Sequence, residues 1–124
     1  MTPVSPAGSE TRDVGCVAET LASRFLEARG VAIIARNYRC RGGEIDIVAR
    51  DGDATVFVEV RLRRNRNFGG AAASITDAKR RRLKIAALHY IASQGKEPRC
   101  RFDAIALHAL DASAIEWLRD IDVA

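Results

Sequence analysis

Two short apolar stretches joined by a turn decide the fold: Gly43-Glu44-Ile45-Asp46-Ile47-Val48-Ala49-Arg50 and Val56-Phe57-Val58-Glu59-Val60-Arg61. Both stretches are rich in isoleucine and valine, and residues 51–54 between them have the composition of a turn. This pattern predicts a β-hairpin. Unlike a purely structural hairpin, it carries carboxylates at positions where apolar side chains would be expected.

Alternation of side chains along a strand divides the hairpin into two faces. One face carries Glu44, Asp46 and Val48 from the first strand and Phe57, Glu59 and Arg61 from the second. The opposite face carries Ile45, Ile47, Ala49, Val56, Val58 and Val60. If residues 51–54 form the loop, Arg50 faces Thr55 and Asp46 faces Glu59, and the Cβ atoms of such opposed residues lie roughly 5 Å apart.

Two opposed carboxylates repel each other unless a cation lies between them or one of them holds a proton. Oxygen ligands from aspartate and glutamate suit Mg²⁺ or Mn²⁺. The alternative is that the charged face is simply solvated, as in many antiparallel hairpins. The spacing of Asp46 and Glu59 alone leaves both interpretations open.

Length and composition indicate one domain over residues 11–124, preceded by a flexible leader over residues 1–10. The chain has no apolar run of membrane-spanning length and no signal peptide, so no membrane association is expected. Its three cysteines are widely spaced and form no Cys-x-x-Cys motif, which argues against a zinc site or a disulfide framework. We expect reduced thiols and a cytoplasmic protein.

The net charge of +4 is unevenly distributed, with nine basic residues and one acid between positions 61 and 84. A basic segment predicts a polyanionic partner, most simply nucleic acid, although a solvated basic face is the alternative. Phe68 in this segment could stack on a base or anchor the loop in the core, and the anchor is favoured. The candidate nucleic-acid-binding residues are Arg63, Arg64, Arg66, Arg80, Arg81, Arg82 and Lys84.

Periodicity and turn signals predict the other elements. They are a helix over 10–29, a strand over 31–38, a helix over 76–93 opened by a capping box at 74–77, and strands over 99–107 and 114–118. With the hairpin, the order is α-β-β-β-α-β-β. It predicts an α/β fold with a mixed sheet flanked by helices.

Two charged residues stand beside the apolar stripes of the predicted helices. The stripe of the first helix is Val14, Val17, Ala18, Leu21, Phe25 and Ala28, widened on one flank by Gly15, Ala22 and Leu26. Glu19 projects into that flank, either as a surface residue, which periodicity favours, or as a third acid turned toward the sheet. Lys79 lies on the inward stripe of the second helix with Leu83, Ala86, Ala87, Tyr90 and Ile91.

The combination of these motifs resembles the YraN-like family of small bacterial proteins over roughly residues 12–118. The resemblance is carried by the Gly43-Glu44-Ile45-Asp46 turn, the Phe57-Val58-Glu59-Val60-Arg61 strand, Gly15-x-x-x-Glu19 and the basic helix after Phe68-Gly69-Gly70. That family is similar to the restriction-endonuclease-like superfamily, which includes archaeal Holliday-junction resolvases. The resemblance therefore implies a restriction-endonuclease-like fold and, by analogy with resolvases, a homodimer.

The resemblance also implies roles for individual residues. Asp46 and Glu59 take the positions of the superfamily's strand acids and metal ligands, Val60 would lend its carbonyl to the metal, and Glu19 takes the position of the helix acid. Arg61 stands where the superfamily has lysine. Arginine stays charged where lysine can lose its proton, so Lys79 becomes the candidate to supply an amine. Its alternative is a side chain that packs its methylenes on the core and extends its ammonium to water.

Three functions follow from these residues. The first is a nucleic-acid-binding protein with a nuclease-type fold, acting as an Mg²⁺- or Mn²⁺-dependent endonuclease on structured or branched DNA. The second is a non-catalytic nucleic-acid-binding module with a degenerate active site. The third is an interaction subunit whose carboxylate patch binds another protein, which the basic segment beside that patch disfavours.

Overall fold

The computed structural model describes residues 9–63, 75–95 and 98–123 of the chain. Its main elements are α1 (Ser9–Glu27), β1 (Ala32–Cys40), β2 (Gly43–Asp51), β3 (Ala54–Leu62), α2 (Asp77–Gln94), β4 (Arg99–Leu107) and β5 (Ile115–Leu118), with a short 3-10 turn, η2 (Ala112–Ala114), before β5. The predicted order and the α/β class are confirmed. Of the residues predicted to form a leader, 1–8 lie outside the described ranges, and α1 begins at Ser9.

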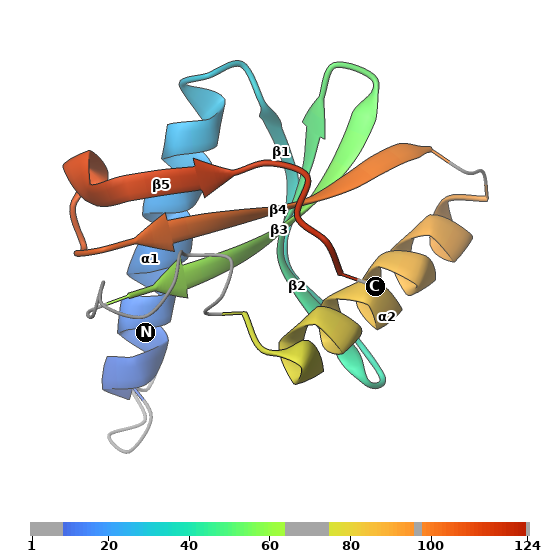
Figure 1. Cartoon of the computed structure of the whole chain (residues 1–124), viewed down its shortest axis with the longest axis horizontal. Coiled ribbons are helices and arrows are strands. Elements are labelled where there is room, and N and C mark those ends of the chain that lie inside the picture. Colours follow the sequence, from blue (N-terminus) through green and yellow to red (C-terminus); the bar gives the residue numbers. More distant parts are fainter. Residues whose placement is uncertain (1–8, 64–74, 96–97, 124) are drawn as a thin grey trace, which may run out of the picture.

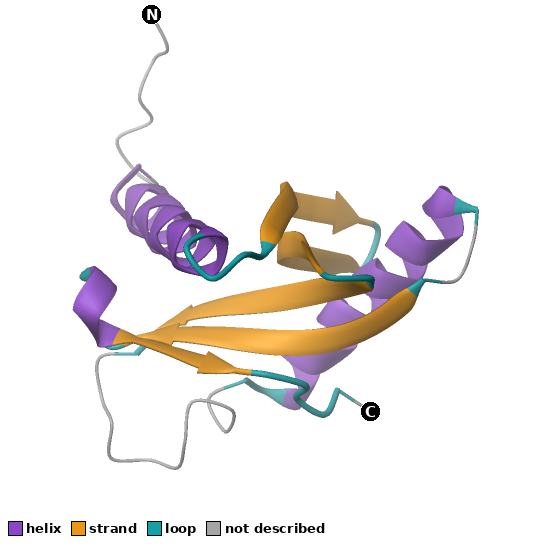
Figure 2. Cartoon of the chain, turned by 90° about the horizontal axis from the view of Figure 1, so that it is seen from above, coloured by secondary structure: helices purple, strands orange, loops and turns teal. Residues whose placement is uncertain are grey.

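The five strands form one sheet in the order β1-β2-β3-β4-β5, with a helix on each face (Figure 1, Figure 2). Neighbouring strands are antiparallel except β3 and β4, which are parallel. A parallel pair needs a crossover connection, and α2 lies in the segment that joins them. None of the helices in the described ranges is long and apolar enough to cross a membrane.

The side of α1 that covers the sheet includes Ala18, Leu21 and Phe25 of the predicted stripe but is rotated toward its predicted flank. Ala18, Ala22 and Leu26 are buried, whereas Val17 is 44% exposed. They pack with Ile47, Ala49, Val56, Val58, Ile105 and Leu107. The buried stripe is therefore centred on the flank into which Glu19 projects, because the alanines allow a close approach to the sheet.

Helix α2 begins at an N-cap and ends at a glycine. The Thr76 hydroxyl accepts a hydrogen bond from the Lys79 N–H (3.2 Å), so Thr76 rather than Ser74 of the predicted capping box is the cap. Gly95 ends the helix in the left-handed conformation, with φ of 72°. The predicted inward stripe is confirmed, since Leu83, Ala86 and Ala87 are buried against Ile45, Val48 and Phe57.

Gly43, the first residue of β2, lies against the backbone of helix α2. A Cβ atom there would lie 2.5 Å from the Arg82 carbonyl oxygen and 2.7 Å from the Ala86 nitrogen, both backbone atoms. We expect Gly43→Ala to lower the free energy of unfolding by about 2 kcal/mol, because the helix must move away from the strand. Urea denaturation followed by circular dichroism measures this change.

The same substitution in α1 is the control for Gly43→Ala. A Cβ atom at Gly15 meets nothing within 4 Å, so Gly15→Ala should stabilise the helix by up to about 1 kcal/mol. If Gly43→Ala were as harmless as Gly15→Ala, the close approach of β2 to α2 would be refuted.

Candidate active site

The predicted pairing of β2 with β3 is confirmed, and it brings Asp46 beside Glu59. Arg50 pairs with Thr55, and the ladder continues to Ile47 and Val58. Asp46 and Glu59 follow one step beyond the last paired residues. There the Asp46 carboxylate accepts a hydrogen bond from the Val60 N–H, with 2.8 Å between Oδ2 and N. A side chain thus replaces the main-chain acceptor at the point where the two strands separate.

The alternation of faces along β2 changes at Asp46. Ile47 and Ala49 pack under α1 as predicted, but Ile45 packs under α2 in the same cluster as Val48. The face predicted for Ile45 is therefore wrong. The position of β1 opposite Asp46, between the pairs Arg36–Ile47 and Tyr38–Ile45, is Asn37, whose φ of 55° interrupts regular strand geometry.

As a result of this change, charged residues on both helices affect the pKa of Asp46. Burial raises its pKa to about 6, against the hydrogen bond from Val60, and the negative charge of Glu19 on α1 raises it further. A smaller opposing influence comes from Lys79 on α2. The carboxylate thus lies near the middle of the layered structure.

The pKa of Glu59 is shifted more strongly than that of Asp46. Burial is the main reason that its pKa rises to about 8, and the negative charge of Asp46 adds to the rise. The positive charges of Lys79 and Arg61 only partly oppose it. In the described part of the chain neither Asp46 nor Glu59 forms an ion pair within 4 Å. Both members of this acid pair therefore hold a proton to higher pH than an ordinary carboxyl group.

Glu19 faces the interior rather than solvent, which overturns the surface position favoured by periodicity. Its side chain is 13% exposed, and its Oε1 atom lies 3.6 Å from Nη2 of Arg36 without making a hydrogen bond. Arg36 is held in turn by the Cys16 carbonyl oxygen (3.2 Å). Within the described ranges, however, no three side chains among histidine, cysteine, aspartate and glutamate lie close enough to share a metal ion.

Of the two cations predicted for the site, Lys79 lies on α2 and Arg61 on β3. Lys79 and Arg82 of α2 line a cleft of about 20 Å³ together with Glu44 and Glu59. Lys79 therefore lies beside Glu59, and its positive charge lowers the pKa of both acids. A cleft of this size can hold a water molecule or a small cation. Arg61 is half-buried, and its Nε has no hydrogen-bond partner in the described part of the chain.

The residues predicted to bind nucleic acid fall into different environments. Arg81 and Lys84 are exposed on α2, and Arg82 is exposed but lies 3.3 Å from Glu44. Arg63 is only 9% exposed, and Arg80 donates hydrogen bonds to the carbonyl oxygens of Ile75 and Asp122. Both differ from the solvent-facing positions expected: the Arg63 main-chain N–H bonds to the Leu107 carbonyl of β4, and the Arg80 side chain bonds to the backbone near the C-terminus. Arg64, Arg66 and Phe68 lie outside the described residues.

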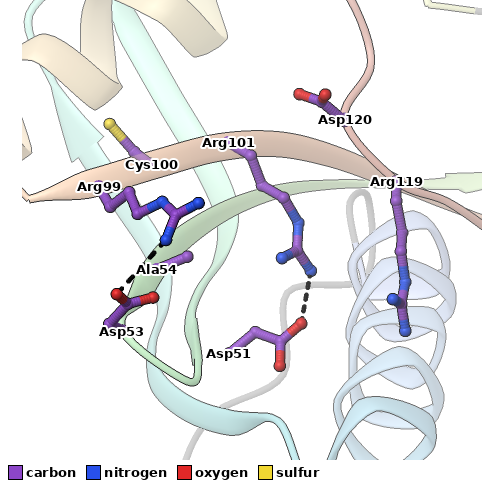
Figure 3. A pocket seen from close by; sticks show the side chains of 8 residues that line it. All are labelled: Asp51, Asp53, Ala54, Arg99, Cys100, Arg101, Arg119 and Asp120. Carbon is purple, nitrogen blue, oxygen red and sulfur yellow. Dashed lines mark hydrogen bonds and ion pairs between the residues drawn. The ribbon is translucent and has the colours of Figure 1, made fainter.

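A larger hollow of about 510 Å³ lies at the other end of the sheet, beside the β2–β3 turn (Figure 3). Ala54, the first residue of β3, lines this hollow. Glu59 lies five residues further along the strand, or about 17 Å away at the usual rise per residue. Two of its three arginines are directed at aspartates, with Arg99 3.5 Å from Asp53 and Arg101 2.8 Å from Asp51, while the guanidinium of Arg119 lies over the Trp117 ring. These charges largely satisfy one another, so the acid pair remains the better candidate for chemistry.

Asp103 beside that hollow is a buried carboxylate that sequence patterns did not single out. It is fully buried and accepts hydrogen bonds from the Arg101 guanidinium (3.1 Å), the Trp117 indole N–H (2.9 Å) and the Asp120 N–H (2.9 Å). These contacts tie β4 to β5 and to the segment that follows. The available signal was an acid inside the apolar stretch Phe102-Asp103-Ala104-Ile105-Ala106-Leu107.

Comparison with known proteins places this arrangement in a family. The family profile described as "Uncharacterised protein family UPF0102" matches residues 18–107, which include both members of the acid pair. A UPF0102 protein of Methylobacillus flagellatus is 53% identical over 109 residues, covering 88% of this chain and 96% of that protein. One of Cupriavidus metallidurans is 51% identical over 119 residues, covering 95% and 86%. The chain therefore belongs to the UPF0102, or YraN-like, family.

Proposed function

We propose that the protein is a divalent-metal-dependent endonuclease that acts on structured or branched DNA. The observation that carries the proposal is the acid pair, two desolvated carboxylates on neighbouring strands with raised pKa values and no ion pair in the described part of the chain. Such an arrangement is unfavourable by itself and becomes favourable when a cation joins it. The resemblance to restriction-endonuclease-like proteins supports the same conclusion.

The carboxylate oxygens of the acid pair are ligands that suit Mg²⁺ or Mn²⁺. Mg²⁺ is usually bound by one or two carboxylates, with waters and substrate phosphates as its other ligands, so a cluster of three acids is not required. The N–H and C=O of one strand residue point to the same edge, which directs the Val60 carbonyl toward Asp46. Asp46, Glu59 and the Val60 carbonyl would hold the metal. When bound, it would polarise the phosphate and lower the pKa of the attacking water.

The surrounding cations have separate roles in this proposal. The guanidinium of Arg61 would stabilise the negative charge on the phosphate in the transition state. Lys79 would hold a phosphate oxygen or the attacking water through its ammonium, since it lines the cleft with Glu59. Glu19 would act as a positioning residue, because its charge reaches Asp46 from the α1 side. Arg81 and Lys84 would contact the DNA backbone.

A cleavage assay in Mn²⁺ on four-way junctions, flaps and single strands tests the proposal. We expect the wild type to cut at least one of these, and Glu59→Gln to lower the rate by at least about a hundredfold, because one metal ligand loses its charge. Lys79→Met should also lose activity, whereas Arg61→Lys should retain or raise it. If the wild type cuts nothing, or Glu59→Gln cuts equally well, the nuclease proposal is refuted.

Metal binding distinguishes a lost ligand from a lost fold in this assay. Asp46→Asn keeps an oxygen for the Val60 N–H but removes the charge, so calorimetry should show at least about tenfold weaker Mn²⁺ binding by a protein whose circular dichroism spectrum matches that of the wild type. The matched control is Asp53→Asn, an exposed carboxylate beside the β2–β3 turn, which should bind Mn²⁺ like the wild type.

The second candidate is a nucleic-acid-binding module without catalytic activity. The observation that favours it is Arg61, a permanently charged residue at the position where the resembling nucleases carry lysine. This alternative predicts salt-sensitive DNA binding by a protein that cleaves none of the substrates in any divalent metal.

A further inference from the structure

A second hollow opens beside the acid pair, between the N-terminal half of α1 and strand β1. We call it the α1–β1 hollow. It has a volume of about 480 Å³ and is lined by Gly15, Cys16, Glu19, Asn37 and Arg39. This volume lies in the range of small-ligand sites. Asn37 lies opposite Asp46 in the β1–β2 pairing, and the charge of Glu19 also acts on Asp46, so the hollow adjoins this member of the acid pair.

Two polar side chains of β1 are presented to the hollow. Asn37 has a φ of 55°, a backbone conformation that non-glycine residues seldom adopt and that tends to occur at ligand sites. Its amide offers both donors and an acceptor. The side chain of Arg39 is 72% exposed and lies 3.7 Å from Glu44, an exposed pair that binds weakly. Its guanidinium can therefore turn to a phosphate or stack on a base.

The wall formed by α1 has a gap at Gly15. A Cβ atom there would meet nothing within 4 Å, so the space in front of this glycine is open. A large side chain at position 15 would extend into the hollow without striking the neighbouring backbone, which provides a means of closing it.

We propose that the α1–β1 hollow receives one unpaired nucleotide of the bound DNA strand, next to the phosphate that reaches Asp46. This inference rests on the proposed function and narrows its substrate to DNA with a single-stranded end. A base inside a duplex must unpair and unstack before it can enter a hollow of this size, whereas a base in a single-stranded extension is already free. Asn37 would contact the base and Arg39 the adjoining phosphate.

Fluorescence anisotropy on two labelled DNAs tests this assignment. The DNAs share one 20-base-pair duplex, which is blunt in the first and carries a short single-stranded extension in the second, and EDTA prevents cleavage. We expect the wild type to bind the extended duplex about tenfold more tightly, the usual scale for recognition of one base. In Gly15→Leu this preference should disappear, while the affinity for the blunt duplex stays the same.

Two further variants separate occlusion of the hollow from damage to the fold. Asn37→Gly keeps the left-handed backbone and removes the amide, so it should reduce the preference several-fold. Ala28→Leu places the same leucine side chain at an exposed position beyond the C-terminal end of α1 and should keep the full preference. Circular dichroism melting curves confirm that each variant is folded.

The outcomes distinguish this inference from the function on which it rests. If the wild type binds both duplexes equally, or Gly15→Leu keeps the preference for the extension, the α1–β1 hollow does not hold a nucleotide. Salt-sensitive binding that ignores the extension would overturn this inference alone. Failure to bind any DNA would overturn the proposed function together with it.

Discussion

Replacing Glu59 by glutamine should make the metal-free protein more stable at pH 8, by roughly 4 kcal/mol. Burial and the neighbouring Asp46 raise the pKa of Glu59 from its ordinary value of 4.5 to about 8. In the unfolded chain Glu59 ionises above pH 4.5, but in the folded protein it keeps its proton up to about pH 8. The folded state therefore binds more protons in this window, and its stability falls as the pH rises.

The pH profile of unfolding measures this effect. In EDTA, the free energy of unfolding of the wild type should fall by roughly 2–3 kcal/mol between pH 6 and pH 8 because of Glu59, and level off above its folded pKa. Asp46 has a pKa raised to about 6, so it contributes to the fall in the free energy of unfolding only below pH 6. Glu59→Gln should remove the fall above pH 6, since its amide does not titrate.

Groups common to both proteins cancel in the difference between their profiles. The matched control is Glu27→Gln, an exposed acid at the end of α1, which should follow the wild type across the range. Mn²⁺ should reverse the order, stabilising the wild type at pH 8 and leaving Glu59→Gln little changed. A wild-type profile that stays flat from pH 6 to pH 8 would show that Glu59 is not desolvated.

Replacing Asp103 by alanine should lower the free energy of unfolding by about 3–5 kcal/mol. Asp103 is fully buried and accepts hydrogen bonds from Arg101, Trp117 and Asp120. Its removal leaves the indole and main-chain N–H groups without their acceptor and leaves the guanidinium with Asp51 alone. Breaking a buried ion pair by removing one partner costs more than the pair itself contributes.

Urea denaturation followed by tryptophan fluorescence measures this loss, since Trp117 is the sole tryptophan and contacts Asp103 directly. Asp103→Asn should lie between alanine and the wild type, because its NH₂ group faces donors while its oxygen still accepts. Asp53→Ala removes an 80% exposed carboxylate from a surface pair and should change stability by less than about 0.5 kcal/mol. Equal effects of Asp53→Ala and Asp103→Ala would refute the role of the buried carboxylate.

The strands, their order along the chain and the β2–β3 register could be predicted from the sequence because each depends on local signals. A turn rich in Asp and Gly between two alternating stretches determines which residues face one another, and Arg50 does pair with Thr55. The inward stripe of α2 followed in the same way from its period.

The environment of the site residues depended on contacts that no local pattern contains. The change of face at Asp46 is opposite a left-handed residue, Asn37, in a different strand. Arg80 is held by the backbone of Asp122, far along the chain. Glu19 is turned inward because Ala18 and Ala22 pack closely on the sheet. In each case tertiary packing, rather than periodicity, decided how much of a charged side chain meets solvent.

The hydrogen bond between Val60 and Asp46 gives the protein a built-in spectroscopic reporter. The N–H that bonds to this carboxylate belongs to the main chain of β3, so its proton chemical shift and its rate of exchange with solvent depend on what the carboxylate is doing. A ligand that draws Asp46 away would release this amide, whereas one that fixes Asp46 in place would protect it. Nuclear magnetic resonance of the Val60 amide can therefore follow occupancy of the site without a labelled substrate or any turnover.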